Sequence, residues 1–457
     1  MLTTIIIVMV IFFAAMAYMG IAGKKHSKDF ETSMNMARSA GPIFIIGSAV
    51  GAHVGNGFVV GGAGDGAAMG LAGALYGLGC ALSYLVFGVL VTKYLYRGNY
   101  LSLKDFLSKR YGDKLTSIIY DVATTLSYIG NIGAQMMAGG ALFEALGFNP
   151  AIGIIAIGVI VFVYTQLGGI WGSQATSTVQ TVIIFFTLVS TAVIIACKGG
   201  LAQIQAIKGV EDGYFHLFSV SFPRLISLTI PTSISTLVDQ ACIQRVNTAR
   251  DEKTAVAGYI YGGLCLVPLA FLPTFVGMYG RAVYGATDKV AFFNVILNEL
   301  PPILAAVAVC AVLSAVMSTI SGFYAAFSAT IIKDIYHDLI NPNASDKQCF
   351  SLSVVFSAIA TVGSVLIALY AGSIIDLLCA TYIFIGSCCL VPFLAGIVWK
   401  KGNAKGAVAS TIVGVIVCIL DMTGVLNPTF PEIFPLIFAL AAYIIVSLAT
   451  QDKSAAE

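Results

Sequence analysis

The sequence predicts an all-α integral membrane protein, and three observations support that prediction. Mean hydropathy is +0.93, and 58% of the residues are hydrophobic while only 10% are charged. In soluble proteins about a quarter of the residues are charged. Apolar stretches of the length that crosses a bilayer, about 20 residues, recur along the whole chain, and the basic residues gather in alternate loops between them.

These stretches leave little sequence for a soluble domain, so we expect one transmembrane domain over residues 1–457 with about thirteen membrane-spanning helices. In order they are 2–21, 41–63, 70–97, 115–147, 150–167, 173–198, 218–244, 254–280, 300–332, 350–371, 373–399, 404–424 and 430–449.

The basic residues predict the orientation. With the N-terminus outside, the outer loops hold only a small part of the 24 Lys and Arg residues, namely Lys198, Lys208, Arg224, Arg281 and Lys289. Cytoplasmic loops carry the excess of Lys and Arg, so the N-terminus is predicted outside and the C-terminus inside. Lys24 and Lys25 follow the first apolar stretch instead of preceding it, so we expect a mature helix and not a signal peptide.

Composition also limits the other function classes. The net charge of +2 gives no support for nucleic-acid binding. The ten cysteines show no zinc-like spacing with histidines, and we expect them to be packing residues. No nucleophile–base pair, paired catalytic carboxylates or phosphate loop occurs in the expected context, so an enzyme is not predicted.

Two apolar stretches carry signs of a broken helix. Stretch 41–63 crowds Gly51, Gly55, Gly57, Gly61 and Gly62 around His53 and Asn56. Such glycines also allow close helix packing, which is the alternative. Stretch 218–244 has Pro231 beside four hydroxyl residues, although a proline kink needs no ligand. The two stretches lie five helices apart, as an inverted five-helix repeat requires.

A cation site is predicted in AVLSAVMSTISG, residues 311–322. Ala315, Ser318 and Thr319 share one helix face, since positions i, i+3 and i+4 are neighbours. A carbonyl and two hydroxyls are hard, neutral oxygen ligands that suit sodium. Alternatively, both hydroxyls bond to carbonyls one turn back.

Residues 164–180, YTQLGGIWGSQATSTVQ, resemble the signature of the sodium:solute symporter family. DQACIQR at 239–245, KRYG at 109–112 and WKKGNAKGA at 399–407 resemble further markers of that family, in the same order. The resemblance implies a leucine-transporter-like (LeuT) fold with a 5+5 inverted repeat. Helix 2–21 would lead, 41–399 would form the ten-helix core, and 404–449 would supply two trailing helices.

The resemblance also implies a sodium site and two departures from the family pattern. The sodium ligands would be Ala52 and Gly55 on the first core helix, and Ala315, Ser318 and Thr319 on the eighth. Many members carry an aspartate where this chain has Ser177, and some carry another where it has Val54. A second sodium ion is therefore not expected.

The family's substrate positions correspond to a hydroxyl- and amide-lined set: Val54, Asn56, Val59, Asn131, Thr232, Ser235 and Thr236. Sugar-transporting members use an aromatic platform and a lysine, and sialic-acid-type members use an arginine. This chain has no counterpart of these residues at the corresponding positions. We therefore expect a small pocket without a fixed charge, for a polar neutral or zwitterionic solute.

The leading hypothesis is a sodium-coupled symporter that imports this solute by alternating access, with one sodium per substrate. We expect a monomer in the plasma membrane, with the bilayer, sodium and the small solute as its partners. A proton-coupled symporter is the alternative, because of His53 and the missing aspartates. A transporter-like nutrient sensor is less favoured, since only QDKSAAE follows the last helix.

Overall fold

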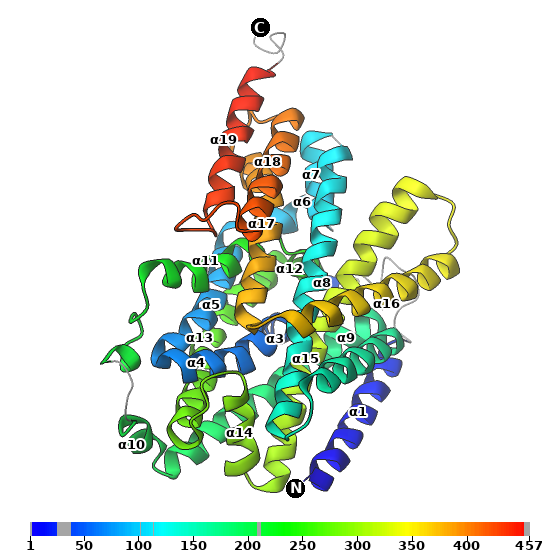
Figure 1. The fold of residues 1–457 in the computed structure, drawn as a ribbon. Coiled ribbons are helices and arrows are strands. Elements are labelled where there is room, and N and C mark those ends of the chain that lie inside the picture. The colour runs from blue at the N-terminus through cyan, green and yellow to red at the C-terminus, as the bar shows by residue number, and fades with distance from the viewer. Residues whose placement is uncertain (1, 25–37, 101, 113, 208–211, 452–457) are drawn as a thin grey trace.

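The computed structural model describes residues 2–24, 38–100, 102–112, 114–207 and 212–451, and helices dominate this part of the chain (Figure 1). Within it, seven helices are long and apolar enough to cross a membrane, and five shorter apolar helices accompany them. Many large apolar side chains on these helices are exposed, as expected for surfaces that face lipid.

The first half of the core begins with a helix in several pieces. Its elements are α3 (Pro42–His53), the π-helix η2 (Gly57–Gly61), α4 (Gly62–Met69), the 3-10 helix η3 (Gly70–Ala74), α5 (Leu75–Leu90), α6 (Thr92–Gly98), α7 (Leu103–Tyr111), α8 (Lys114–Ala145) and α9 (Pro150–Cys197). The connection to the second half contains α10 (Gly200–Gln205) and η4 (Asp212–Phe215).

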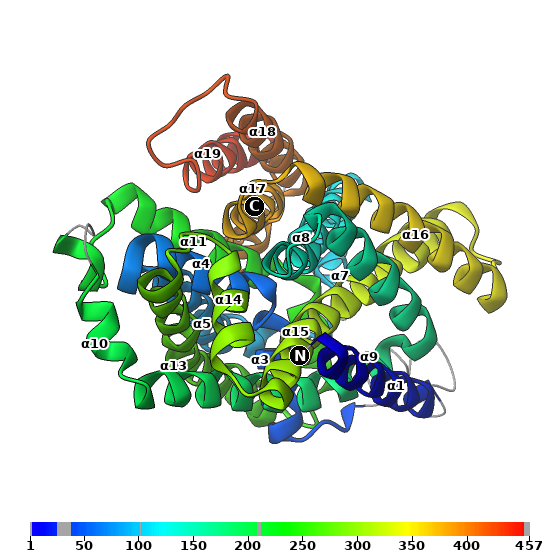
Figure 2. The same cartoon turned by 60° about the horizontal axis from the view of Figure 1, so that its bottom comes forward.

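The second half of the core repeats the interruption in its first helix. Its elements are α11 (Phe222–Val238), α12 (Gln240–Thr248), α13 (Glu252–Tyr284), α14 (Val290–Glu299), α15 (Pro302–Ser328), the π-helix η5 (Ala329–Ile340), α16 (Asp346–Tyr370) and α17 (Ile374–Val398). The leading helix α1 (Leu2–Lys24) packs on α9 and α15, whereas the trailing helices α18 (Ala404–Met422) and α19 (Phe434–Ala449) pack on each other and on α17. Figure 2 shows these two additions on different sides of the core.

One prediction of separate helices needs correction. Stretches 150–167 and 173–198 belong to a single helical element, α9, because no proline follows Pro150 within it to remove a backbone hydrogen bond. At 1.5 Å per residue its 48 residues extend about 72 Å, more than twice a hydrocarbon layer of about 30 Å. The number thirteen stays a prediction.

The helix breaks occur in the two predicted stretches, although one lies at another residue. In the first core helix, Val54 and Gly55 separate α3 from the following helical turns. In the sixth, α11 continues through Pro231 and ends at Val238, so the break falls at Asp239. Asp239 stabilises the new start there, since its side chain accepts a hydrogen bond from the backbone N–H of Ala241 at 3.0 Å.

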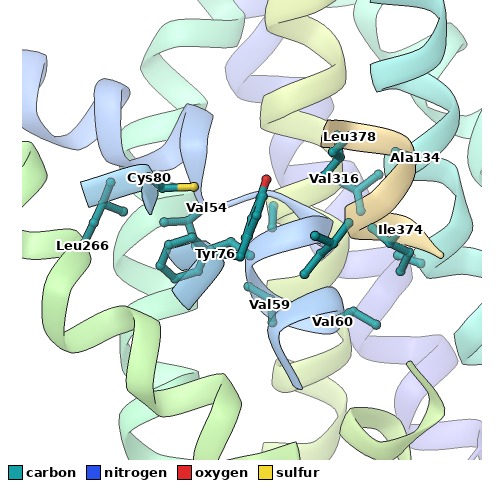
Figure 3. Close-up of a cluster of buried hydrophobic side chains, with 14 of the residues drawn as sticks. Val54, Val59, Val60, Tyr76, Cys80, Ala134, Leu266, Val316, Ile374 and Leu378 are labelled. Atoms are coloured by element: carbon teal, nitrogen blue, oxygen red, sulfur yellow. The ribbon is translucent and has the colours of Figure 1, made fainter. Parts of the chain in front are cut away.

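The buried core lies where these broken helices meet α8, α15 and α17. Figure 3 shows Val54, Val59 and Val60 of the first core helix in one apolar cluster with Val316 of α15 and Leu378 of α17. This packing holds the first break against neighbouring helices, which can satisfy the freed backbone groups.

Candidate functional site

The first break brings the backbone of Gly55 against two polar side chains. A Cβ at Gly55 would lie 2.7 Å from Oε1 of Gln135 and 2.9 Å from Oγ1 of Thr319. Real Cβ atoms essentially never come within 3.0 Å of another heavy atom, so a larger residue at position 55 would displace the side chain of Gln135 or Thr319. The last turn of α3 and residue 55 therefore face the hydroxyl of Thr319 on α15.

The predicted sodium ligands of α15 are buried at this break. Ser318 Oγ donates a hydrogen bond to the Gly51 carbonyl at 2.8 Å and is also 3.2 Å from the Ala315 carbonyl. Thr319 Oγ1 donates to the Ala315 carbonyl at 2.9 Å. Both hydroxyls thus bond one turn back, and that of Ser318 also reaches α3. A hydroxyl that donates its proton keeps lone pairs that can face a cation.

The chemistry of this oxygen set fits sodium. Ala52 lies in the last turn of α3, where carbonyls lose their intrahelical partners. The carbonyl of Gly55, in the break, accepts a hydrogen bond from the backbone N–H of Val59 at 3.1 Å and keeps a second lone pair. Among the described residues, no cluster of three or more His, Cys, Asp or Glu side chains could hold a metal ion. The oxygens at this break are carbonyl and hydroxyl groups, the hard neutral ligands that an alkali cation accepts.

A narrow polar cavity adjoins the predicted sodium ligands and contains four of the seven predicted substrate positions, Asn131, Thr232, Ser235 and Thr236. Its volume is about 40 Å³. Gly55 and Thr319 line the same cavity, so the predicted ion and solute positions share a wall. Because this volume is close to that of one or two water molecules, a larger solute requires the surrounding helices to separate.

The other three predicted substrate positions lie outside the cavity wall as described. Val54 and Val59 are 1% and 2% exposed and belong to the apolar cluster (Figure 3). Asn56 is tied to α8, because its Nδ2 donates to the Ala134 carbonyl at 2.8 Å and its backbone N–H donates to Gln135 Oε1 at 2.7 Å. These contacts connect the first core helix with α8 beside the cavity.

Asn131 has a free acceptor in the cavity wall. Its Nδ2 donates to the Ser127 carbonyl at 2.9 Å, one turn earlier on α8, whereas its buried Oδ1 has no hydrogen-bond partner. On α11, Thr236 Oγ1 contacts the Thr232 carbonyl at 2.8 Å and Ser83 Oγ at 3.0 Å. The cavity wall thus contains an amide acceptor and hydroxyl groups, which suit a polar solute.

The expectation of a pocket without a fixed charge is wrong, since Asp239 and Arg245 also line the cavity. Asp239 Oδ1 accepts from Tyr128 Oη at 3.2 Å as well as from its own helix start. Arg245 is only 6% exposed; its Nη1 donates to the Ala241 carbonyl at 3.1 Å, and its Nε has no partner. The sequence held the signal: both residues stand at the ends of the DQACIQR marker, next to a predicted break.

Aromatic rings of the cavity wall were also missed from the sequence. They come from several helices, so no local spacing reveals them: Phe58, Tyr76, Tyr128, Phe323 and Tyr382. His53 lines the cavity too, and its ring packs on Tyr84 with 4.5 Å between centroids. Its position is compatible with both a packing role and a solute contact. The side chain of Ser177 lies outside the described residues.

Two other marker motifs contact each other at the cytoplasmic end predicted for α17. Arg110, from KRYG, donates hydrogen bonds to the carbonyls of Gly396, Trp399 and Gly402 at 2.9, 3.0 and 3.2 Å. A cation beside the last carbonyls of a helix is stabilising, both by hydrogen bonding and by the helix dipole. KRYG and WKKGNAKGA therefore form one structural contact between α7 and the end of α17.

An apolar helix bundle in which two discontinuous helices enclose a polar cavity is the architecture of a secondary transporter. The chain belongs to the sodium:solute symporter family, whose family model matches residues 33–414. It is therefore a multi-pass membrane transporter with sodium as its coupling ion, and its family is one of transporters and not of enzymes.

Curated relatives match most of the chain. The Sodium/pantothenate symporter of Escherichia coli (strain K12) is 27% identical, with 81% of this chain and 82% of that protein covered. The High-affinity proline transporter PutP of Bacillus subtilis (strain 168) is 26% identical, with 85% and 88% covered. A solved structure of a Na⁺-coupled sialic acid symporter, substrate-bound and outward-open, shares the fold with a TM-score of 0.83 at 18% identity, and the match covers 98% of both chains. The fold is LeuT-like, as the resemblance implied.

Proposed function

We propose that this symporter imports a small polar solute, neutral or zwitterionic, together with one sodium ion. The observation that supports it most is the shared wall of the two predicted sites, since Gly55 and Thr319 line the cavity that also contains Asn131 and Thr232. A cation bound at the break would order the ends of α3 and the facing turn of α15. Binding of sodium would therefore favour the conformation in which the solute site is complete. Sodium and solute are then coupled because both bind this conformation more tightly than the other.

The charges in the cavity agree with this solute class. Asp239 and Arg245 are one carboxylate and one guanidinium, so they supply no net charge that would select an anion or a cation. The amide of Asn131 and the hydroxyls of α11 can bond to hydroxyl, amino or carboxylate groups of a solute. Proline, named for one relative, is a zwitterion of this class, whereas pantothenate, named for another, is a small polar carboxylate anion.

One sodium per solute is proposed because two carboxylates of the family pattern are replaced in this chain. Ser177 and Val54 stand where family members carry aspartates. A second cation at those two positions would lack the carboxylates, and a buried charge without compensation is costly. Exchange between inward and outward exposure of the same site completes the transport cycle.

The test is uptake by proteoliposomes with an inward sodium gradient across a panel of solutes that contains pantothenate, proline, glucose and myo-inositol. We expect accumulation of one chemical class, and its loss when choline replaces sodium. Accumulation driven by a pH gradient and indifferent to sodium would support the proton-coupled alternative, for which His53 in the cavity wall is the motivating residue.

A further inference from the structure

The side chain of Gln135 on α8 holds one backbone group of the first break. Gln135 Oε1 accepts a hydrogen bond from the backbone N–H of Asn56, with 2.7 Å between oxygen and nitrogen. A backbone N–H can only donate, so the oxygen of the side-chain amide must face it and Nε2 must point elsewhere. Asn56 Nδ2 donates in turn to the Ala134 carbonyl at 2.8 Å. Two neighbouring residues of α8 therefore hold residue 56 in place.

The peptide group that Gln135 holds also carries the carbonyl of Gly55. The N–H of residue 56 and the carbonyl of residue 55 belong to one planar unit, so they cannot turn independently. The unit is trans, and its N–H and carbonyl therefore point in opposite directions. A hydrogen bond that fixes the direction of the N–H thus also fixes the direction of the carbonyl, which is one of the predicted sodium ligands.

This peptide group needs an outside partner because it follows a glycine. Without a Cβ, residue 55 has a wide choice of backbone angles, and the unit between residues 55 and 56 can turn at small cost. The Gly55 carbonyl accepts a hydrogen bond from the N–H of Val59 at 3.1 Å, within the first core helix. The bond to Gln135 holds the other end of the unit and comes from a different helix. It therefore anchors the carbonyl to α8.

Burial strengthens the dependence on Gln135. Its side chain is 3% exposed and Asn56 is fully buried. A buried N–H must find an acceptor within the protein, so loss of the amide oxygen would favour a turn of the peptide group towards another acceptor. The site of a Cβ on Gly55 is also 2.9 Å from Oγ1 of Thr319, another predicted ligand. A turn of the unit would thus occur beside the ligands of α15.

We propose that Gln135 is a positioning residue of the sodium site, whose Oε1 sets the direction of the Gly55 carbonyl without binding the ion itself. This role rests on the proposed function, in which that carbonyl is a sodium ligand. It requires the acceptor of the amide and not its donor. Gln135 also lines the solute cavity, where Nε2 is the group that a solute would meet, so the two ends of the amide can be tested separately.

The test uses sodium alone on the purified full-length protein. Thermal unfolding is followed at increasing NaCl, with choline chloride keeping the ionic strength constant, and the sodium concentration that gives a fixed stabilisation is compared between variants. Gln135→Leu removes the acceptor and should raise this concentration by about three- to tenfold, as expected for one lost hydrogen bond. Gln135→Glu keeps an acceptor oxygen whether its carboxyl group is charged or neutral, and should not raise it.

A merely structural role would give a different pattern. It would lower the unfolding temperature in choline chloride and leave the sodium requirement unchanged. Ser117→Ala is the matched control, because Ser117 lies on the same helix and its Oγ bonds to Ser108 Oγ of α7 at 2.9 Å, outside both predicted sites. It should leave the sodium requirement unchanged. If Gln135→Leu does not fold, Gln135→Met is the second variant without an amide oxygen.

Three results would overturn the positioning role: an unchanged sodium requirement in Gln135→Leu, an equal rise in Gln135→Glu, or an equal rise in Ser117→Ala. The double variant Ser318→Ala with Thr319→Ala, measured in the same assay, tests the ligands themselves. If it needs more sodium while Gln135→Leu does not, the ligand assignment stands and the role of Gln135 is refuted. Absence of uptake for every solute of the panel, with the expected sodium pattern, would count against the proposed function and would support the role of Gln135.

Discussion

Removal of the two α15 hydroxyls should weaken sodium binding more than it weakens the fold. The perturbation is the double substitution Ser318→Ala with Thr319→Ala, which deletes two of the five proposed oxygens and leaves the carbonyls of Ala52, Gly55 and Ala315. Both hydroxyls are buried, and that of Ser318 also bonds to the Gly51 carbonyl at 2.8 Å. The structural loss includes the contact of Ser318 with α3 and the contacts of both hydroxyls with the Ala315 carbonyl within α15.

The two effects differ in size. A hydrogen bond between membrane helices contributes about 0.6 kcal/mol on average, so losing these contacts should destabilise the protein by about 1 kcal/mol. A polar group that faces a full charge contributes about 1.5–3 kcal/mol. Loss of two such groups should lower sodium affinity by at least about tenfold, since tenfold corresponds to about 1.4 kcal/mol.

The assay is the sodium dependence of thermal stability in purified protein, followed by the sodium dependence of uptake. Ligand binding stabilises by RT ln(1 + [L]/Kd), so a weaker site shifts the stabilisation curve to higher sodium. Ser314→Ala is the matched control, because Ser314 is buried on the same helix and bonds only one turn back, to the Cys310 carbonyl at 2.7 Å. Unchanged sodium dependence in the double variant would refute the assignment of these ligands.

Two further substitutions test the solute site and the break. Asn131→Ala removes the unpartnered Oδ1, so an interaction of about 1–3 kcal/mol with the solute is lost. The solute concentration for half-maximal uptake should therefore rise, with little change in sodium affinity. Normal uptake kinetics would make Asn131 a packing residue. Gly55→Ala places a Cβ within 3.0 Å of Gln135 and Thr319 and should abolish sodium-dependent uptake. Gly41→Ala is the control and should not, because no atom lies within 4 Å of its Cβ. Equal uptake by both variants would show that the close approach of residue 55 to Gln135 and Thr319 is dispensable.

The sequence predicted the elements that depend on local chemistry. The apolar stretches, the break in the glycine-rich helix and the shared face of Ala315, Ser318 and Thr319 all follow from neighbouring residues. The position of the second break does not, because Pro231 is accommodated within α11 while Asp239 stabilises a new helix start eight residues later. A helix-breaking residue such as proline therefore predicts which helix is interrupted, but it does not predict the residue at which the interruption falls.

The cavity wall was harder to predict because it is assembled from distant segments. Four of the predicted solute positions line it, yet Val54 and Val59 point into the apolar cluster and Asn56 bonds to α8. Adjacent residues at an irregular break do not follow a helical period, so their directions cannot be read from spacing. Arg245 was missed for a related reason. A charged residue near a predicted helix end is ordinarily exposed to solvent, and only the fold shows that this one is buried.

The central claim is coupling of one sodium ion to one solute molecule, and the accumulation ratio at equilibrium tests it most directly. Proteoliposomes are held at zero membrane potential with a tenfold inward sodium gradient, and the solute is followed until net flux stops. One sodium per neutral solute predicts about tenfold accumulation, because each tenfold gradient is worth about 1.4 kcal/mol, and a His53→Gln variant should reach the same ratio. Accumulation of about a hundredfold would indicate two sodium ions, and accumulation that follows an imposed pH gradient without sodium would contradict the account.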